Sequence, residues 1–248
     1  MIQGIGTYML VDPIGKTDSG ITTYVHFAEK FLLKQGLSVL VKTRNPKESM
    51  TSFRKRIAAA ANACTSEGRK LVIEAPETGA STLSVNSDRT KLHVRLHCSK
   101  NLGLIVQGQQ ALSESLGLEQ QELTRANMIS APSQSAFSAS RKIFQLPERI
   151  SIYPNPAPDI EASNSNKQKA TKTRPYVLFV GRWHRLKGNL FLMEFAEKLP
   201  EIDFKAVTTS PYLSKSKLPA NLIVLDGARW NKKEVYENAS LVVIPSIF

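Results

Sequence analysis

Short apolar runs alternate along the chain with segments of helical periodicity. Runs rich in β-branched and aromatic residues predict buried strands at 8–11, 37–41, 70–74, 91–97, 128–131, 150–153, 176–180, 204–207, 222–225 and 241–244. Between them, apolar residues spaced three and four apart predict amphipathic helices, for example over 22–35 and 189–199. This alternation predicts an α/β protein.

The strand predicted over 91–97 has an apolar face and a polar face. Its alternate residues are Leu92, Val94 and Leu96 on one side, and Lys91, His93, Arg95 and His97 on the other. On a strand, the two histidines lie about 13 Å apart, too far for one metal ion, so no metal site is predicted. His97 falls at the carboxyl end, where open α/β sheets bind ligands. The alternative is an edge strand whose polar face lies in water.

A basic turn follows the strand predicted over 176–180. The strand stops at Gly181, and the turn contains Arg182, His184, Arg185 and Lys187 before the next helix opens near Gly188. A helix amino terminus presents N–H groups and partial positive charge to anions. Arg182, a forked donor, and Lys187, a point charge, complete a site suited to a diphosphate. The alternative is a solvated loop.

Composition limits the class of protein. The 248 residues, 42% hydrophobic and 22% charged, are typical of a soluble globular protein with one large or two modest domains. The sequence contains neither a membrane-spanning run nor a basic-then-apolar leader, which favours a cytoplasmic location. Cys64 and Cys98 form neither a metal-like cluster nor a disulfide framework. We find no GxGxxG fingerprint of a dinucleotide-binding dehydrogenase.

The net charge of +12 calls for an anionic partner. The sequence shows no nucleic-acid-binding motif, so a phosphorylated ligand, with or without an anionic membrane surface, fits better. The segment that follows Asn45 predicts a helix with Pro46 at its first position and the cations Arg54, Lys55 and Arg56. Such a helix could lie on a membrane, or its charges could form a solvated face.

Several segments resemble glycosyltransferase family 4, whose members are retaining enzymes of the GT-B fold. F-V-G-R-x-x-x-x-K-G at 179–188 is similar to the opening of that family's second domain. V-R-L-H at 94–97 resembles its strand ending in histidine, and 128–133 its strand ending in serine. The P-N-P at 154–156 resembles the I-P-N segment that closes the first domain, and L-V-V-I-P-S at 241–246 a later strand. These motifs occur in the family's order.

The resemblance implies an α/β fold with two Rossmann-like domains of GT-B type, the second incomplete. The expected boundaries are 1–158 for the acceptor-side domain, 159–174 for a linker and 175–248 for part of the donor domain. The family's paired glutamates, which hold the donor sugar and ribose, would follow the P-S turn at 245–246 and are not in this sequence. We therefore expect a fragment or truncated reading frame, with doubtful activity by itself.

The resemblance also implies roles for individual residues. Arg182 and Lys187 would grip the donor diphosphate, and His97 would lie beside the donor sugar. The other expected ligand-binding residues are Gly20, Ser133, Asn155 and Gly181. Three of these have structural alternatives: Gly20 as a turn glycine, Ser133 as a helix cap and Asn155 as a turn residue.

The implied activity is transfer of a sugar from a nucleotide-sugar donor, with retention of configuration. The donor is a substrate, and no separate cofactor is expected. The acceptor would be a surface glycan or a lipid-linked saccharide, and the enzyme cytoplasmic or peripheral at the inner face of the membrane. The alternatives are a nucleotide-sugar epimerase of the same fold and a non-catalytic nucleotide- or partner-binding module.

Overall fold

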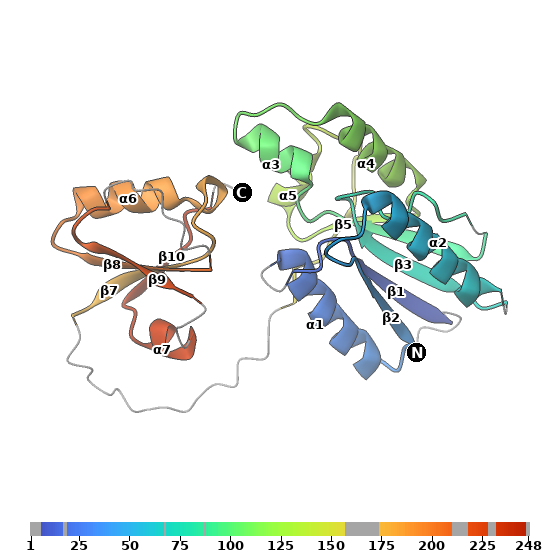
Figure 1. The fold of residues 1–248 in the computed structure, drawn as a ribbon, viewed down its shortest axis with the longest axis horizontal. Coiled ribbons are helices and arrows are strands. Elements are labelled where there is room, and N and C mark those ends of the chain that lie inside the picture. The colour runs from blue at the N-terminus through green and yellow to red at the C-terminus, as the bar shows by residue number, and fades with distance from the viewer. Residues whose placement is uncertain are drawn as a thin grey trace. The chain divides into compact units, whose positions relative to one another are not determined.

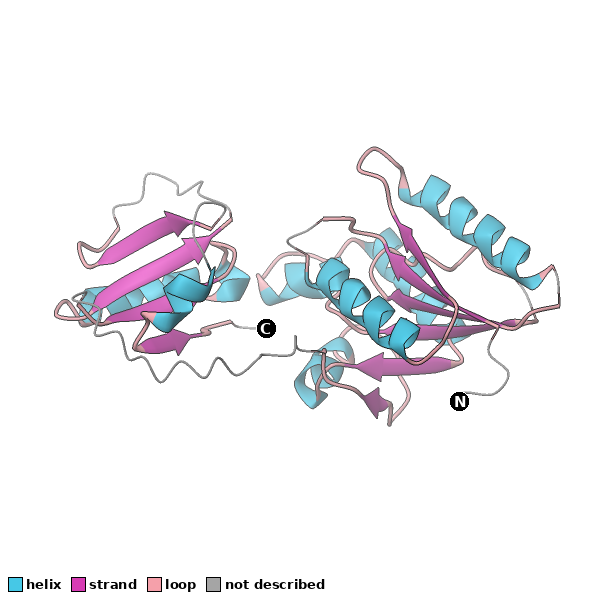
Figure 2. Ribbon diagram, turned by 90° about the horizontal axis from the view of Figure 1, so that it is seen from below, coloured by secondary structure: helices cyan, strands magenta, loops and turns pink. Residues whose placement is uncertain are grey.

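The computed structural model describes residues 6–16, 19–66, 68–86, 88–156, 174–209, 218–227 and 232–246. The chain divides into two compact units, Met1–Asp159 and Ile160–Phe248. The linker predicted over 159–174 lies, except for Arg174, outside the described residues. Figure 2, in which strands are magenta and helices cyan, shows the two sheets and the helices against them.

The first unit contains a six-stranded parallel sheet in the order β2-β1-β3-β4-β5-β6. Its strands are β1 (Thr7–Asp12), β2 (Val39–Thr43), β3 (Leu71–Pro76), β4 (Thr90–Arg95), β5 (Met128–Ala131) and β6 (Ser151–Ile152). Consecutive strands pair in parallel, with Glu74 opposite His93 and Arg95 opposite Ser130. β4 is therefore an interior strand, and the edge-strand alternative is wrong.

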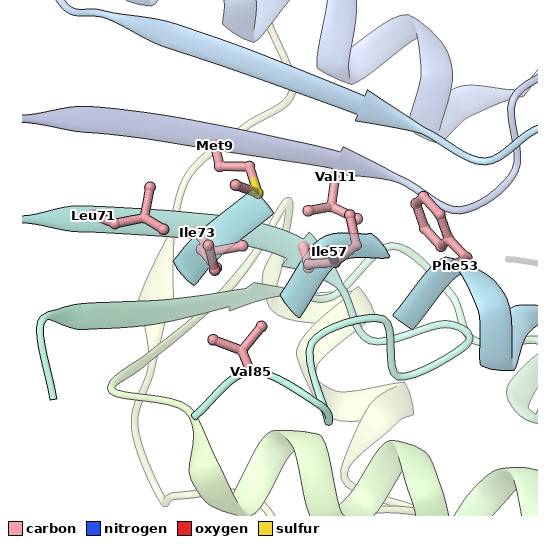
Figure 3. Close-up of a cluster of buried hydrophobic side chains, with 9 residues drawn as sticks. Met9, Val11, Phe53, Ile57, Leu71, Ile73 and Val85 are labelled. Atoms are coloured by element: carbon pink, nitrogen blue, oxygen red, sulfur yellow. The ribbon is translucent and has the colours of Figure 1, made fainter. Parts of the chain in front are cut away.

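Two long helices cover opposite faces of this sheet. α1 (Gly20–Lys34) packs Ile21, Val25 and Ala28 onto the face that holds Leu10. α2 (Met50–Thr65) packs on the other face, where the core cluster consists of Met9, Val11, Phe53, Ile57, Ala61, Leu71, Ile73, Ala75 and Val85. Figure 3 shows side chains of β1 and β3 meeting those of α2. Burial of these apolar side chains is the main stabilising contribution to this half of the unit.

The described part of the first unit also contains three shorter helices. α3 (Lys100–Val106), α4 (Ser113–Arg125) and α5 (Gln134–Ser140) follow β4 and β5 in the chain. Leu123 of α4 and Phe137 of α5 pack with Val94 and Leu96 in a second core cluster. The sequence pattern did not predict α3.

The second unit contains a four-stranded parallel sheet in the order β10-β7-β8-β9. Its elements are β7 (Tyr176–Val180), the 3₁₀ turn η1 (Arg185–Lys187), α6 (Asn189–Lys198), β8 (Asp203–Thr208), β9 (Leu222–Asp226), α7 (Lys232–Glu237) and β10 (Leu241–Val243). α6 covers the face of Phe179, and α7 the face of Leu178 (Figure 1). The start of the helix predicted from Trp230 lies outside the described residues.

The helix predicted to begin at Pro46 begins four residues later. Ser49 caps α2 by accepting a hydrogen bond from the Ser52 N–H at 3.1 Å. Glu48 accepts the Asn45 N–H, but it also forms a bidentate pair with Arg56 at 2.7 and 2.8 Å. That tertiary pair holds residues 45–48 in a separate turn ahead of the helix.

Arg54 and Arg56 of α2 bind other groups of the protein, whereas Lys55 is exposed. Arg54 donates to the carbonyls of Gly79 and Ala80, and Arg56 is held by Glu48. The apolar stripe of α2 packs on the sheet, so it is not available to enter a membrane. Among the described helices, none combines the length and apolar character required to span a bilayer.

Candidate functional site

The strand order of the first unit defines where a ligand would bind. From β1 the chain moves outward to β2, then returns across the sheet to β3, so the order reverses between β1 and β3. In open α/β sheets the crevice lies outside the carboxyl ends of the strands at such a switch point. A small pocket lies at this position, with a cavity volume of about 10 Å³, which is room for about one water molecule. It is lined by residues of β1, α1, β3 and β4 and by His97, with Tyr24, Glu74, Arg95 and His97 as its polar groups.

Glu74 is the centre of a buried polar network on the α1 face of the sheet. Its carboxylate accepts hydrogen bonds from the hydroxyls of Tyr8 (2.5 Å) and Tyr24, and lies 3.2 Å from His93 Nδ1. Burial by itself would raise the pKa of Glu74. The contacts with His93, Tyr24 and Tyr8 outweigh burial and lower this pKa to about 2. Glu74 is therefore a fixed negative charge at the pocket.

Arg95 is a buried cation that extends this network. Its side chain is only 2% exposed and lies over the Tyr24 ring, with Cζ 4.5 Å from the ring centroid. Its Nη2 donates to the Tyr153 carbonyl at 2.7 Å and to Asn155 Oδ1 at 2.9 Å. Arg95 thus connects the pocket to the last described segment of the first unit.

His97 lies at the carboxyl end of β4, as its place in the sequence predicted. Its ring packs edge-on against Tyr24, with the centroids 4.8 Å apart, and lines the pocket. Burial, together with the nearby Arg95 guanidinium, lowers the pKa of His97 to about 3. The imidazole is therefore neutral at pH 7 and can both donate and accept a hydrogen bond.

His93 has a different role from His97. Its Nε2 lies 2.7 Å from Ser130 Oγ, which completes a chain from Glu74 through His93 to Ser130 across three neighbouring strands. Ser130 is fully buried and does not line the pocket. We therefore interpret these linked contacts as a structural network, because the Ser130 hydroxyl is not accessible to a substrate.

Gly20 is the exposed first residue of α1, next to Ile21, which lines the pocket. A Cβ atom at Gly20 would meet nothing within 4 Å, so its surroundings leave space for a ligand. The glycine that this loop itself requires is Gly15, where φ is +61° and a Cβ would lie 2.5 Å from the Arg44 carbonyl oxygen. The turn-geometry alternative therefore applies to Gly15.

Replacing Gly20 with alanine tests whether this glycine provides space for a ligand or is required by the backbone conformation. We expect Gly20→Ala to leave stability unchanged or to raise it by about 0.4–1 kcal/mol, because alanine fits and is the better helix former. A ligand that approaches the α1 backbone would bind less tightly to the variant. Thermal denaturation and ligand titration measure the two effects, and a clear loss of stability would contradict this interpretation.

Ser133 and Asn155 both have structural roles in the first unit. Ser133 caps α5, and its Oγ accepts the Ala136 N–H at 3.1 Å. Asn155 accepts from Arg95 and is exposed. These contacts place Asn155 in the pocket network through Arg95, whereas Ser133 lies at a helix start.

The second unit has its own switch point. From β7 the chain moves outward to β8 and β9, then returns to β10 on the other side of β7. The crevice therefore lies outside the carboxyl ends of β7 and β10. Gly181 follows β7 directly, and its N–H donates to the Val207 carbonyl at 3.0 Å. The loop that starts at Gly181 contains both predicted anion-binding residues.

Arg182 and Lys187 are cations without protein partners in the described part of the chain. Arg182 is exposed, and Lys187 is the half-buried last residue of η1. Neither side chain forms a hydrogen bond or ion pair with a described residue, whereas Arg56 and Lys198 are paired. α6 begins at Asn189, with Gly188 as its N-cap, and has neither a side-chain cap nor an acidic residue in its first turn. Within the described residues, Arg182 and Lys187 are therefore positive charges that no acidic side chain neutralises directly.

Gly188 connects this loop to the other side of the switch point. It has φ +79°, and a Cβ there would lie 2.0 Å from the Pro245 carbonyl oxygen. The loop after β7 and the segment after β10 are therefore in direct backbone contact.

No protein-family model and no curated protein matches this sequence. Among solved structures, the chain is similar to sucrose-phosphate synthase from Thermosynechococcus elongatus (TM-score 0.69, 16% identity, 98% of this chain and 76% of that one). It is also similar to a glycosyltransferase from Rickettsia africae ESF-5 (TM-score 0.58, 14% identity, 98% and 73%). At such identities the likeness concerns the fold. It confirms the predicted α/β architecture of two Rossmann-like units of GT-B type with the second incomplete.

The sequence interpretation missed Glu74, Tyr24 and Arg95. Two signals were present: a glutamate next to the carboxyl end of an apolar strand, and an arginine within the alternating segment that ends at His97. Both residues were assigned to solvent-facing or unremarkable positions, because a single strand does not reveal what covers its polar face.

Proposed function

We propose that this chain is the sugar-transferring part of a glycosyltransferase that uses a nucleotide-sugar donor. The supporting observation is that Arg182 and Lys187, at the switch point of the second sheet and ahead of α6, have no ion-pair partner among the residues that the structure describes. An anionic diphosphate fits this position through both side-chain and helix-terminus contacts.

The proposed chemistry follows from charge. Cleavage of the bond between sugar and diphosphate leaves negative charge on the departing nucleoside diphosphate. Arg182 and Lys187 would stabilise that charge as it develops, which is typically the largest contribution to such catalysis. His97, neutral at pH 7, would hydrogen-bond the sugar, and Gly20 would leave room for ligand near α1.

The finer parts of the proposal concern organisation and partners. We propose residues 1–158 as the acceptor-side domain, 159–174 as a linker and 175–248 as part of the donor domain. The acceptor would be a glycan or a lipid-linked saccharide, and transfer would retain configuration. Any contact with an anionic membrane would depend on surface charge, since the apolar side of α2 is in the core.

Alanine substitution at the two cations tests the donor site. We expect Arg182→Ala and Lys187→Ala each to weaken nucleoside-diphosphate binding by about 1.5–3 kcal/mol, the range for hydrogen bonds to charged groups. Isothermal titration calorimetry with UDP, GDP and ADP measures this directly.

Arg174→Ala is the matched control. Arg174 precedes β7, at the opposite end of that strand, where it pairs with Asp203 and the Glu201 carbonyl. The Arg174→Ala substitution also removes one positive charge, but away from the proposed site. The nucleoside-diphosphate affinity of this variant should stay within about twofold of that of the unmodified chain. Equal losses at positions 174, 182 and 187 would indicate a net-charge effect and would contradict a specific site. Donor binding with no transfer or hydrolysis would instead favour a binding module.

A further inference from the structure

The chain turns sharply where β4 ends. The Leu96 N–H still donates to the Ser130 carbonyl at 2.8 Å, and α3 starts at Lys100 with Ser99 as its cap. Between these points Cys98 has φ +98°, a conformation that residues with side chains rarely adopt. Such a backbone costs about 1–3 kcal/mol and persists only where surrounding contacts hold it.

Glu77 provides those contacts. It lies just after β3, and its side chain is fully buried. One carboxylate oxygen accepts the His97 N–H and the other accepts the Cys98 N–H, each at 2.9 Å. Two successive N–H groups directed at one anion form the kind of concave site that elsewhere binds a free anion. Here the protein's own carboxylate occupies it.

We call the two hydrogen bonds from the His97 and Cys98 N–H groups to Glu77 the clamp. This clamp acts on His97, the residue that faces the pocket. His97 contributes one of the two N–H groups, and its ring lies against Tyr24 at the switch point. We propose that Glu77 is a positioning residue, which holds the His97 imidazole at the pocket through the backbone of His97 and Cys98. The inference rests on the proposed function for the role of His97, but the clamp itself does not.

The clamp requires an ionised carboxylate. A carboxylate can accept both N–H groups, whereas a protonated acid converts one oxygen into a donor that opposes an N–H. Glu119 and Glu122 of α4 interact electrostatically with Glu77, and Arg54 of α2 interacts with Glu122. Burial, together with the Glu119 carboxyl, raises the pKa of Glu77 to about 7. The His97 ring, with a pKa of about 3, does not titrate near that pH.

Nuclear magnetic resonance of the ¹⁵N-labelled chain tests the clamp without any ligand. Between pH 5 and 9, the amide signals of His97 and Cys98 should shift together with one midpoint near 7. Glu77→Gln should abolish this joint shift. Absence of the shift in the unmodified chain, or its persistence in Glu77→Gln, would overturn the proposal.

Glu122→Gln is the matched control for this experiment. Glu122 is equally buried, but it accepts from the Thr82 N–H and hydroxyl at 2.7 Å and does not contact the His97 corner. Its substitution should change the Thr82 amide signal and leave the joint shift of His97 and Cys98 present, although its midpoint can move because Glu122 and Glu77 interact electrostatically. If Glu122→Gln also abolished the joint shift, its loss in Glu77→Gln would reflect a general loss of order in this region, and the proposed clamp would be overturned.

Turnover distinguishes positioning from a purely structural contact. With UDP-glucose as the probe donor, or another nucleotide sugar that calorimetry shows to bind, we expect Glu77→Gln to lower kcat about 10- to 100-fold, with the donor KM within about twofold. Glu122→Gln should keep kcat. A Glu77→Gln chain with unchanged kcat would overturn the positioning role. If the unmodified chain turns over no donor, the proposed function fails, and the resonance experiment alone decides the clamp.

Discussion

Gly188→Ala is expected to destabilise the second unit by about 3 kcal/mol or more. The new methyl group would lie 2.0 Å from the Pro245 carbonyl oxygen, well inside van der Waals contact. That neighbour is backbone, so no side-chain rotation relieves the overlap. In addition, alanine would have to adopt φ +79° at the point where η1 ends and α6 begins.

The same substitution should reduce nucleoside-diphosphate binding. Relief of the overlap would move either the loop that carries Lys187 or the segment after β10, and these are the two sides of the switch point. The chain has two tryptophans, Trp183 and Trp230, both in the second unit. Denaturant unfolding followed by tryptophan fluorescence therefore reports on this unit.

Gly36→Ala is the control for the conformational cost alone. Gly36 has φ +76°, but a Cβ there would meet nothing within 4 Å. We expect Gly36→Ala to lower the stability of the first unit by about 1 kcal/mol, which circular dichroism during denaturant unfolding measures because both tryptophans lie in the second unit. If Gly188→Ala cost no more than Gly36→Ala, the close contact with Pro245 would not exist in solution.

Glu74→Gln is expected to destabilise the first unit by about 3 kcal/mol or more. The carboxylate accepts from the hydroxyls of Tyr8 and Tyr24 and lies beside His93 Nδ1. An amide presents one acceptor and two donors, so it leaves at least one buried hydroxyl without an acceptor and removes the counter-charge of the network.

The pH dependence identifies Glu74 as the source. Its pKa in the folded protein is about 2, below the ordinary value of 4.5. A depressed pKa means that the unfolded chain binds the proton more readily than the folded one. The contribution of ionised Glu74 to folding stability is therefore fully present above about pH 4.5 and disappears as pH falls towards 2. The unmodified chain should therefore lose stability over this range more steeply than Glu74→Gln.

Circular dichroism during denaturant unfolding at several pH values measures both effects. Glu114→Gln is the control, because Glu114 is exposed in the first turn of α4 and should change stability by less than about 0.5 kcal/mol. Parallel stability curves for the unmodified chain and Glu74→Gln below pH 4.5 would refute the assignment.

Much of the element order could be predicted from the sequence. The strands at 128–131 and 176–180 have the predicted bounds. For 176–180 the reason is a continuous apolar run rich in β-branched and aromatic residues. α2 began later than predicted, since the capping residues near Asn45 were recruited by Arg56, eight residues beyond Glu48. The ion pair between Glu48 and Arg56 therefore has more influence on where α2 begins than the local capping pattern does.

The candidate site could be predicted only in part. His97 comes shortly after β4, and the loop directly after β7 contains Gly181, Arg182 and Lys187. Within each parallel sheet the carboxyl ends of the strands meet at one edge. Their place along the chain therefore sufficed to locate them. Glu77 lies in a loop rich in small polar residues, and nothing in its neighbourhood distinguishes it as a buried carboxyl group.

The sequence by itself determined the α/β alternation and the cations at the end of β7, because apolar periodicity and chain order are local properties. Only the tertiary structure decided that the polar face of β4 lies under α1, that Glu74 and Arg95 are buried together, and that Glu77 holds the His97 corner. Burial of a polar group depends on which segments, distant in sequence, supply its partners. The sequence pattern of a single strand does not identify those partners.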